Sequence, residues 1–425
     1  MLLLLVCLVP VLTEDPLRGV LKSRSATYNL YNEFKKDNNL IYSPREDKER
    51  FKLFKYSISN VATYNEDLED TGHYGVNFFS VLSPAEKMKY HGLNITEINL
   101  AQEADEDYAD TDSKLLLKSS SRRSKILWTN TGHVTDAKNQ KDCGCCWAFG
   151  AVAALETRYK IKSGVLRSFS AQEFVDCTYE YDKSRNGCKA GSAVAAFIWS
   201  ERNGGRLAAE KDLPFKERDN TCKSSSTPNA MKAYKISGHR TVGKNEASHI
   251  WALQFGAVAS VIEATDKFHQ YDGSIMKDTT CKGEVNHLVT MVGYTELFIL
   301  LKNSWGSEWG DRGFVRLTRN YDNCGLYTGT SYPTLKPTGE SDSNSDPATN
   351  YRPPVDYSKP CWDEVPEVCE KIECCSCIKS FWMLLYVVNN CQKSCDFCER
   401  NYEGECPPGT VKCNDGVCRH EHMCH

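Results

Sequence analysis

The sequence has no excess of charge of either sign and no long apolar run. Its 52 basic and 56 acidic residues give a net charge of −4, so the charge balance does not indicate nucleic acid or an anionic membrane as a partner. The apolar run Leu2–Leu12 is well short of the ~20 residues that a membrane-spanning helix needs, and Phe381–Val388 is shorter still. We therefore expect no membrane span.

The N-terminus is instead typical of a secretory signal peptide. The apolar run is followed at once by Thr13, Glu14 and Asp15, which would end it, so we expect residues 1–13 to form the signal peptide. The 21 cysteines agree with this, because so many thiols suit a compartment in which disulfides form. We expect a secreted protein, extracellular or lysosomal.

Cysteine is absent from residues 20–118, a charged region with apolar residues at helical spacing, which predicts a small helical domain. The apolar positions of this domain are Leu30, Tyr31, Phe34, Phe51, Phe54, Ile58 and Val61.

A polar link follows near residues 118–125. It contains Arg122 and Arg123 and is of the kind that proteases cut.

Residues 126–333 read as one globular region of the α+β class. A helical pattern at Trp147–Ile161, with Gly164 as its stop signal, comes early in this region. The strand patterns come late, and helices before strands favour an α+β arrangement. The predicted strands are Leu288–Tyr294, Phe298–Lys302 and Phe314–Thr318.

The last part of the chain changes composition twice. Residues 334–360 are rich in Ser, Asp, Asn and Pro, which predicts a linker that cannot bury enough apolar surface to fold. Residues 361–425 then hold twelve cysteines in 65 residues, so disulfides should replace a hydrophobic core there.

Cys146 begins the apolar helical pattern, where the positive end of the helix dipole would stabilise a thiolate. Gln140 lies in the polar turn just before it and could donate to a developing oxyanion. His287 starts a predicted buried strand, and Asn303 ends the next one, followed by the indole of Trp305. Taken singly, each residue has an ordinary structural explanation: a disulfide cysteine, a core histidine or an asparagine in a turn.

Taken together, five segments resemble the papain family of cysteine proteases in order and spacing, over roughly residues 126–333. This agreement outweighs the separate structural explanations. The segments are Asn139–Phe149, Ser170–Cys177, Gly187–Gly191, Asn286–His287 and Lys302–Gly306.

The resemblance implies a papain-like two-lobed fold, with Cys146 on a helical lobe and both His287 and Asn303 on a β-barrel-like lobe. It implies that Cys146 attacks a peptide carbonyl as thiolate, that His287 protonates the leaving amine, and that Gln140 stabilises the oxyanion. Protein or peptide substrates are the implied partners, with no cofactor and no metal. The sequence shows no paired histidines of an occluding loop, which favours an endopeptidase.

The resemblance also places a set of residues along the substrate cleft. None of the pocket residues is charged, so we expect an apolar preference two residues before the scissile bond. Ala190 stands where glycine is usual. The expected cleft residues are Gly191, Ser192, Ala193, Val261, Leu288, Trp305 and Gly329.

Residues 20–118 resemble the inhibitory propeptide of cathepsin L-like proteases, so the chain's own propeptide is expected to block the cleft until it is cut near residues 118–125. Gly75–Phe79 resembles the second motif of such propeptides, with Val81 replacing the usual aspartate. The first, an interrupted helical motif, is represented by Glu46, Arg50, Phe54 and Asn65, with Ser57 and Val61 at positions where other residues are usual.

The family pattern implies three disulfides in the globular region: Cys143 with Cys188, Cys177 with Cys222, and Cys281 with Cys324. Cys145 and Cys146 remain. A bond between these neighbours would be strained, so an idle Cys145 thiol is the favoured interpretation.

The tail resembles two small modules whose ligand the sequence does not reveal. Residues 361–398 resemble a sea-anemone-toxin-like (ShKT) module with two additional cysteines, Cys374 and Cys375. Residues 406–425 resemble the opening of an LDL-receptor class A repeat that lacks its calcium ligands. Zinc binding by the clustered Cys and His is the alternative, but an oxidising compartment favours disulfides. Asn94 and Thr96 form an N-glycosylation sequon.

Two functions of different class therefore remain. The first is an active protease made as an inactive precursor. The second is a secreted binding protein that keeps the protease fold as a scaffold for its tail. The presence of all four expected catalytic residues favours the protease, since a scaffold need not retain them.

Overall fold

The computed structural model describes the helical region, the globular region and two short strands of the tail. The chain divides into two compact units: the helical region up to Tyr74 belongs to one, and Gly75–Pro354 form the other. The described residues are 15–93, 124–181, 187–319, 324–342, 411–412 and 418–419. The expected signal peptide, the Asn94 sequon and, apart from the paired strands β11 (Val411–Lys412) and β12 (Cys418–Arg419), the tail modules lie outside these ranges.

The predicted helical domain is confirmed as three helices: α1 (Pro16–Leu21), α2 (Arg24–Asp37) and α3 (Pro44–Asn65). Ser43 caps α3 through its side chain, and a proline follows at the first helical position. Five of the seven apolar positions singled out in the sequence are buried, while Leu30 and Phe51 are half-buried. The buried positions are Tyr31, Phe34, Phe54, Ile58 and Val61.

Asn65, at the end of α3, fastens the chain that follows the helix. Its side-chain amide donates to the carbonyl oxygen of Tyr74 at 3.0 Å, and its carbonyl accepts from the Tyr74 N–H at 2.9 Å. Glu46 and Arg50 form an ion pair one turn apart, at 3.1 Å. These contacts show what the residues of the interrupted helical motif do locally: they hold the helix and its exit.

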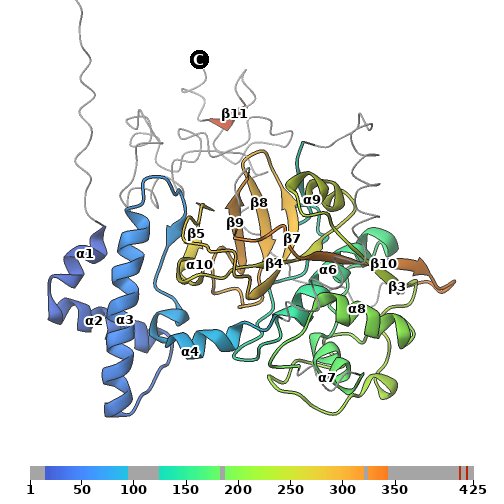
Figure 1. Ribbon diagram of the computed structural model, residues 1–425, viewed down its shortest axis with the longest axis horizontal. Coiled ribbons are helices and arrows are strands. Elements are labelled where there is room, and N and C mark those ends of the chain that lie inside the picture. The colour runs from blue at the N-terminus through green and yellow to red at the C-terminus, as the bar shows by residue number, and fades with distance from the viewer. Residues whose placement is uncertain are drawn as a thin grey trace, which may run out of the picture. The chain divides into compact units, whose positions relative to one another are not determined.

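The second unit is built on an eight-stranded sheet with the strand order β3-β10-β4-β7-β8-β9-β6, in which β2 also pairs with β7. Figure 1 shows β7, β8 and β9 side by side, with α6 next to β7. The strands are β2 (Ile126–Leu127), β3 (Tyr234–Thr241), β4 (Val258–Ile262), β6 (Ile275–Met276), β7 (His287–Tyr294), β8 (Phe298–Lys302), β9 (Phe314–Thr318) and β10 (Thr330–Pro337).

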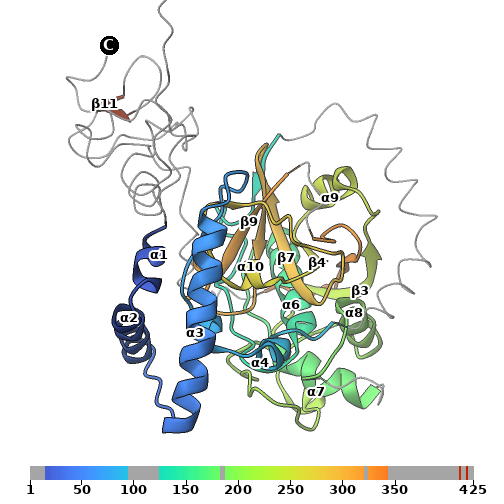
Figure 2. The same ribbon diagram turned by 60° about the vertical axis from the view of Figure 1, so that its left-hand side comes forward.

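The helices of this unit lie mainly before the sheet in sequence, which confirms the predicted α+β class. Figure 2 shows α7 and α8 at the end of the unit away from α9. The helices are α4 (Pro84–Lys87), α6 (Cys146–Ser163), α7 (Ala171–Tyr181), α8 (Ala193–Arg202), α9 (Glu246–Leu253) and α10 (Asp266–His269), with the short strand β5 (Tyr271–Gly273) after α10.

Helix α6 is the centre of the helical part. It is buried from Cys146 to Tyr159 and packs against β7 and β10. Gly164 ends it in the left-handed conformation, φ 78°, and donates its N–H to the carbonyl oxygen of Lys160. A helix buried on all sides fits the nearly continuous small and apolar residues of its first three turns.

The peptidase-like region extends past its expected end at Pro333. Strand β10 runs on to Pro337 and pairs with β3, and Leu335 packs against the core. Asp342 then accepts a hydrogen bond from Tyr159 on α6 at 2.6 Å. Composition alone predicted a linker from residue 334, but pairing with an edge strand supplies the hydrogen bonds that these polar residues need.

Among the described residues, no helix is both long enough and apolar enough to cross a membrane.

Candidate active site

Cys146 is the first residue of α6 and is fully buried. Cys145 is the N-cap of α6 and makes no side-chain hydrogen bond to the helix. The first backbone N–H groups of α6 therefore point toward the end of the helix that carries the Cys146 thiol. The backbone N–H of Leu288, the residue after His287, also favours the Cys146 thiolate by a hydrogen bond to its sulfur. The helix start and the start of β7 therefore meet at this sulfur.

His287 begins β7, and Asn303 directly follows β8, the neighbouring antiparallel strand. The two side chains are joined by a 2.8 Å hydrogen bond between His287 Nε2 and Asn303 Oδ1. The same oxygen accepts the N–H of Ser304, so Asn303 is an acceptor and Nε2 carries the proton. Nδ1 is then an unprotonated acceptor, buried and without a hydrogen-bond partner among the described residues.

Trp305 covers the imidazole. The rings of His287 and Trp305 stack at 4.6 Å and 28°, and the indole is 1% exposed. Trp309 meets Trp305 edge to face at 5.0 Å. The histidine–asparagine pair is therefore shielded from water.

Gln140 lies in the turn before α6, next to the Asn303 loop. Its Nε2 donates to the carbonyl oxygens of Cys143 at 2.9 Å and Tyr90 at 3.0 Å. Its Oε1 accepts the hydroxyl of Ser304 at 2.6 Å, and its backbone N–H donates to the Ser304 carbonyl. The sequence did not reveal this role of Ser304; its position beside Asn303 was the only signal.

The expected cleft residues lie around this centre and are mostly buried. Gly191 packs so closely on Trp147 that a Cβ would lie 2.5 Å from the indole. Ser192 caps α8, and Ala193 begins that helix. Val261 and Leu288 face each other across β4 and β7, and the Val261 N–H donates to the Gly329 carbonyl.

The segment 88–93 runs through this site. The Gly92 carbonyl accepts the N–H of Gly191 at 3.1 Å, and Leu93 pairs with Gly191 as a parallel bridge. A Cβ on Gly92 would lie 1.8 Å from the backbone oxygen of Gly144, so the two backbones are in direct contact. Tyr90 places its carbonyl oxygen on the Gln140 amide.

The preceding motif Gly75–Phe79 docks on α10 and the residues after it. The Asn77 side chain donates to the carbonyl oxygen of His269 at 2.8 Å, and Phe79 packs edge to face on Trp305 at 4.7 Å. Val81, which replaces the usual aspartate, is 2% exposed. The motif fixes the start of the segment that covers the site.

Burial sets the charge state of the covered site. It raises the pKa of Cys146 to about 12, although the surrounding backbone N–H groups favour the thiolate. It lowers the pKa of His287 to about 3, although the hydrogen bond to Asn303 favours the imidazolium. With the segment in place, both groups are neutral at physiological pH.

Within the described ranges the structure forms three disulfides, Cys143–Cys188, Cys177–Cys222 and Cys281–Cys324, which are the pairs that the family pattern implies. Cys145 and Cys146 are free thiols, and burial raises the pKa of Cys145 well above its usual value.

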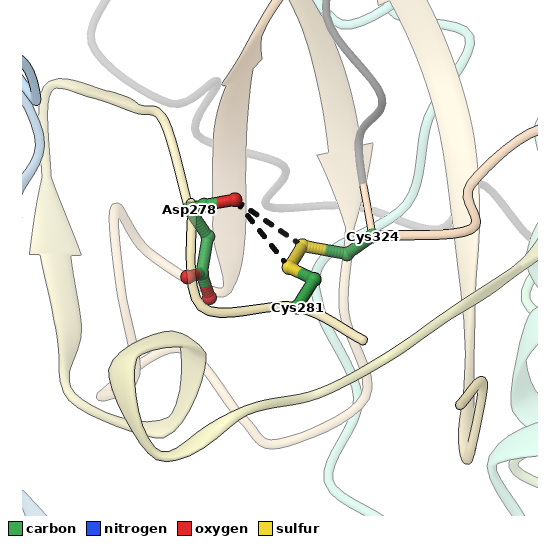
Figure 3. Close-up of side chains that lie close together, drawn as sticks. All are labelled: Asp278, Cys281 and Cys324. Atoms are coloured by element: carbon green, nitrogen blue, oxygen red, sulfur yellow. Dashed lines mark hydrogen bonds between the residues drawn. A yellow bond between two sulfur atoms is a disulfide. The ribbon is translucent and has the colours of Figure 1, made fainter. Parts of the chain in front are cut away.

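One of these disulfides lies beside Asp278. Figure 3 shows the sulfurs of Cys281 and Cys324 bonded to each other beside the Asp278 backbone carbonyl. A disulfide sulfur is not a thiolate and does not act as a metal ligand. This group of Cys and Asp, which has the composition of a metal site, is therefore a structural crosslink.

Comparison with known proteins finds matches over both the globular region and the helical region. Residues 123–334 match the family described as papain family cysteine protease, and residues 31–86 match the cathepsin propeptide inhibitor domain (I29). Fruit bromelain of Ananas comosus is 31% identical over 318 residues, 72% of this chain and 86% of the relative. A cathepsin L-like proteinase of Phaedon cochleariae is 29% identical over 326 residues, 74% of this chain and 96% of the relative. Digestive procathepsin L2 proteinase from the larval midgut of Tenebrio molitor has a TM-score of 0.63 at 28% identity, covering 72% of this chain and 99% of that one.

Proposed function

Because the chain belongs to the papain family of cysteine proteases, we propose that Cys146 is its nucleophile, His287 its base and Asn303 the residue that orients the base. The chain is a cysteine endopeptidase made as a zymogen with a cathepsin propeptide. The observation that carries the residue roles is the 2.8 Å bond from His287 Nε2 to Asn303, which leaves Nδ1 free to accept a proton.

The geometry supports a two-step hydrolysis. Nδ1 of His287 takes the thiol proton, and the Cys146 thiolate adds to the peptide carbonyl carbon. The resulting oxyanion accepts hydrogen bonds from Gln140 Nε2 and the Cys146 backbone N–H. The imidazolium then protonates the leaving amine as the C–N bond breaks, and water, deprotonated by the same imidazole, releases the acyl group and restores the thiol.

Residues 88–93 would hold this machinery inactive in the precursor. The Tyr90 carbonyl occupies the Gln140 donor, and Gly92 lies against the chain before Cys146. Removal of the segment exposes both catalytic groups to water, which lowers the pKa of the thiol and raises that of the imidazole. An ion pair of thiolate and imidazolium then becomes accessible.

The preference of the acyl-side pocket is proposed to be apolar. Leu93 pairs with Gly191 and packs against the hydrophobic core cluster to which Leu288 and Ala193 belong. The segment itself thus offers a leucine to a pocket without charge. A fluorogenic panel with Leu, Phe and Arg two residues before the scissile bond tests this, and a strong preference for Arg contradicts it.

Further proposals rest on sequence: a signal peptide at 1–13, a propeptide at 20–118, a peptidase domain from 126, and ShKT-like and partial LDL-receptor class A-like segments at 361–398 and 406–425. A secreted or lysosomal location is proposed from the cysteine content and agrees with the three disulfides. The ligand of the tail is unassigned.

The decisive experiment is labelling of the processed protein by the epoxide inhibitor E-64. Wild type should be labelled at one thiol, and Cys146→Ala should not be labelled. Cys145→Ser is the matched control, because it removes the neighbouring free thiol and should keep the label. If folded, processed wild type takes no label, the scaffold function is favoured instead.

A further inference from the structure

A second imidazole lies in the site and has no part in the proposed mechanism. His269 ends α10, is 3% exposed, and stacks on Trp305 at 5.3 Å and 10°. Trp305 thus contacts two imidazoles, those of His269 and His287. Nδ1 of His269 has no hydrogen-bond partner among the described residues.

The covering segment shows on which side of the nucleophile His269 lies. Leu93 pairs with Gly191. The backbone of Gly92 forms a hydrogen bond with the Cys146 sulfur. His91 contacts His269. The chain therefore passes the sulfur between Gly191 and His269. Since Gly191 belongs to the proposed acyl side, His269 lies on the side of the leaving group.

The position beside His269 is occupied by a planar, hydrogen-bonding side chain. His91 Nε2 lies 3.1 Å from His269 Nε2, and the two rings stack at 5.3 Å and 21°. This subsite therefore has space for a ring or a carboxyl group and offers it one polar contact in an otherwise aromatic wall.

We propose that His269 determines specificity for the residue after the scissile bond, selecting a hydrogen-bonding side chain there and, in acid, a carboxylate. The proposal rests on the proposed function and adds a residue that reads the leaving half of the substrate. An imidazolium donates a charge-assisted hydrogen bond to a carboxylate, which an aliphatic side chain cannot accept.

The charges around His269 explain why acid matters in the processed enzyme. In the precursor, burial holds the pKa of His269 well below its usual value, helped by His91, Lys87 and His287. His91 and Lys87 leave with the propeptide. Asp266, whose Oδ1 lies 3.9 Å from His269 Nδ1 and binds Lys87 at 2.7 Å, then loses its lysine partner. Each of these changes raises the pKa of His269 and favours the imidazolium, against His287, which stays in the processed enzyme and lowers that pKa.

The test uses processed enzyme whose active sites are counted with E-64, and three internally quenched peptides that differ only in Glu, Gln or Leu after the scissile bond. We expect kcat/KM for Glu over Leu to reach ~10-fold at pH 5, the size of a charge-assisted hydrogen bond. The Glu/Gln ratio should rise from pH 7 to pH 5, between the ordinary pKa values of about 6.5 for His and 4.3 for Glu. The Gln/Leu ratio should stay flat.

Three variants separate a specificity role from a structural one. His269→Leu should abolish the preference for both Glu and Gln, whereas His269→Asn should keep Gln over Leu and lose the acid-dependent gain for Glu. His133→Asn, a partly exposed histidine outside the site, should leave all ratios as in wild type.

Wild-type ratios in His269→Leu, or a pH-independent preference for Leu in wild type, would overturn the role of His269. Absence of E-64 labelling would contradict the proposed nucleophile instead, so the two failures are distinguishable.

Discussion

The side-chain amide of Gln140 donates to the backbone carbonyl oxygen of Tyr90 at 3.0 Å. A carbonyl oxygen of the segment 88–93 thus accepts a hydrogen bond from the donor that the proposed mechanism reserves for the oxyanion. The Ser304 hydroxyl fixes the same side chain by donating to its Oε1 at 2.6 Å. In the proposed mechanism, one preorganised group therefore serves both inhibition and transition-state stabilisation.

Gln140→Ala should therefore slow the processed enzyme. Loss of one oxyanion donor costs about 10²–10³-fold in kcat, and KM should change little because the interaction strengthens only in the transition state. Ser304→Ala is the control: it removes the hydroxyl behind the amide but leaves the donor, so its effect should be several-fold smaller. Equal losses in both variants would contradict a role for the Gln140 donor.

Asn303→Ala should lower kcat/KM and narrow the active pH range. Misplacing the imidazole costs on the order of 10²-fold. The hydrogen bond to Asn303 also favours the imidazolium against burial, so its loss lowers the pKa of His287. Because the ion pair needs a protonated imidazole, the alkaline limb of the kcat/KM profile should move to lower pH. A limb that stays in place would show that Asn303 does not tune the base.

Gly92→Ala should weaken inhibition in the precursor. The added Cβ would lie 1.8 Å from the backbone oxygen of Gly144, which cannot yield as a flexible side chain could. Displacement of the segment should raise the rate at which E-64 labels the unprocessed chain by about tenfold, which corresponds to ~1.4 kcal/mol. Gly19→Ala, where an added Cβ meets nothing within 4 Å, should label at the wild-type rate.

Glu156→Gln should destabilise the globular unit. Glu156 is 1% exposed and binds Lys138 at 2.9 Å. Burial alone would raise its pKa, but Lys138 and Lys302 hold it below its usual value. Breaking such a buried pair costs about 3–5 kcal/mol.

Thermal unfolding of wild type and Glu156→Gln at several pH values measures this cost. A depressed pKa contributes stability above the unfolded value, so the difference should be full at pH 7 and shrink as pH falls below ~4.5. Glu210→Gln removes the more exposed partner of Lys138 and should cost under ~1 kcal/mol. A cost for Glu156→Gln no larger than that control would contradict the buried-pair account.

Local patterns predicted the scaffold of the site well. Strands β8 and β9 have the predicted bounds, because each is an apolar run ended by polar residues or glycine. Gly164 ends α6 as predicted, because the end of the helix requires a left-handed backbone conformation that glycine adopts readily. Cys146 and Asn303 follow from these elements, since each lies at an element's end.

Contacts between distant residues were not predictable from such patterns. His91 and His269 are separated by 178 positions, and neither lies in a local pattern that indicates the other. The extension of β10 past Pro333 likewise depends on β3, a partner almost a hundred residues earlier. Composition indicates how much apolar surface a segment can bury by itself, but it does not indicate which strand edge the segment will pair with.

The Cys143–Cys188 disulfide starts three residues before Cys146, the proposed nucleophile, and joins the turn before α6 to the stretch that carries Gly191. Reductant that keeps Cys146 active also acts on this crosslink, and Cys188 is only half-buried. Assay buffers therefore have an upper as well as a lower limit of useful thiol concentration. Activity measured against reductant should pass through a maximum.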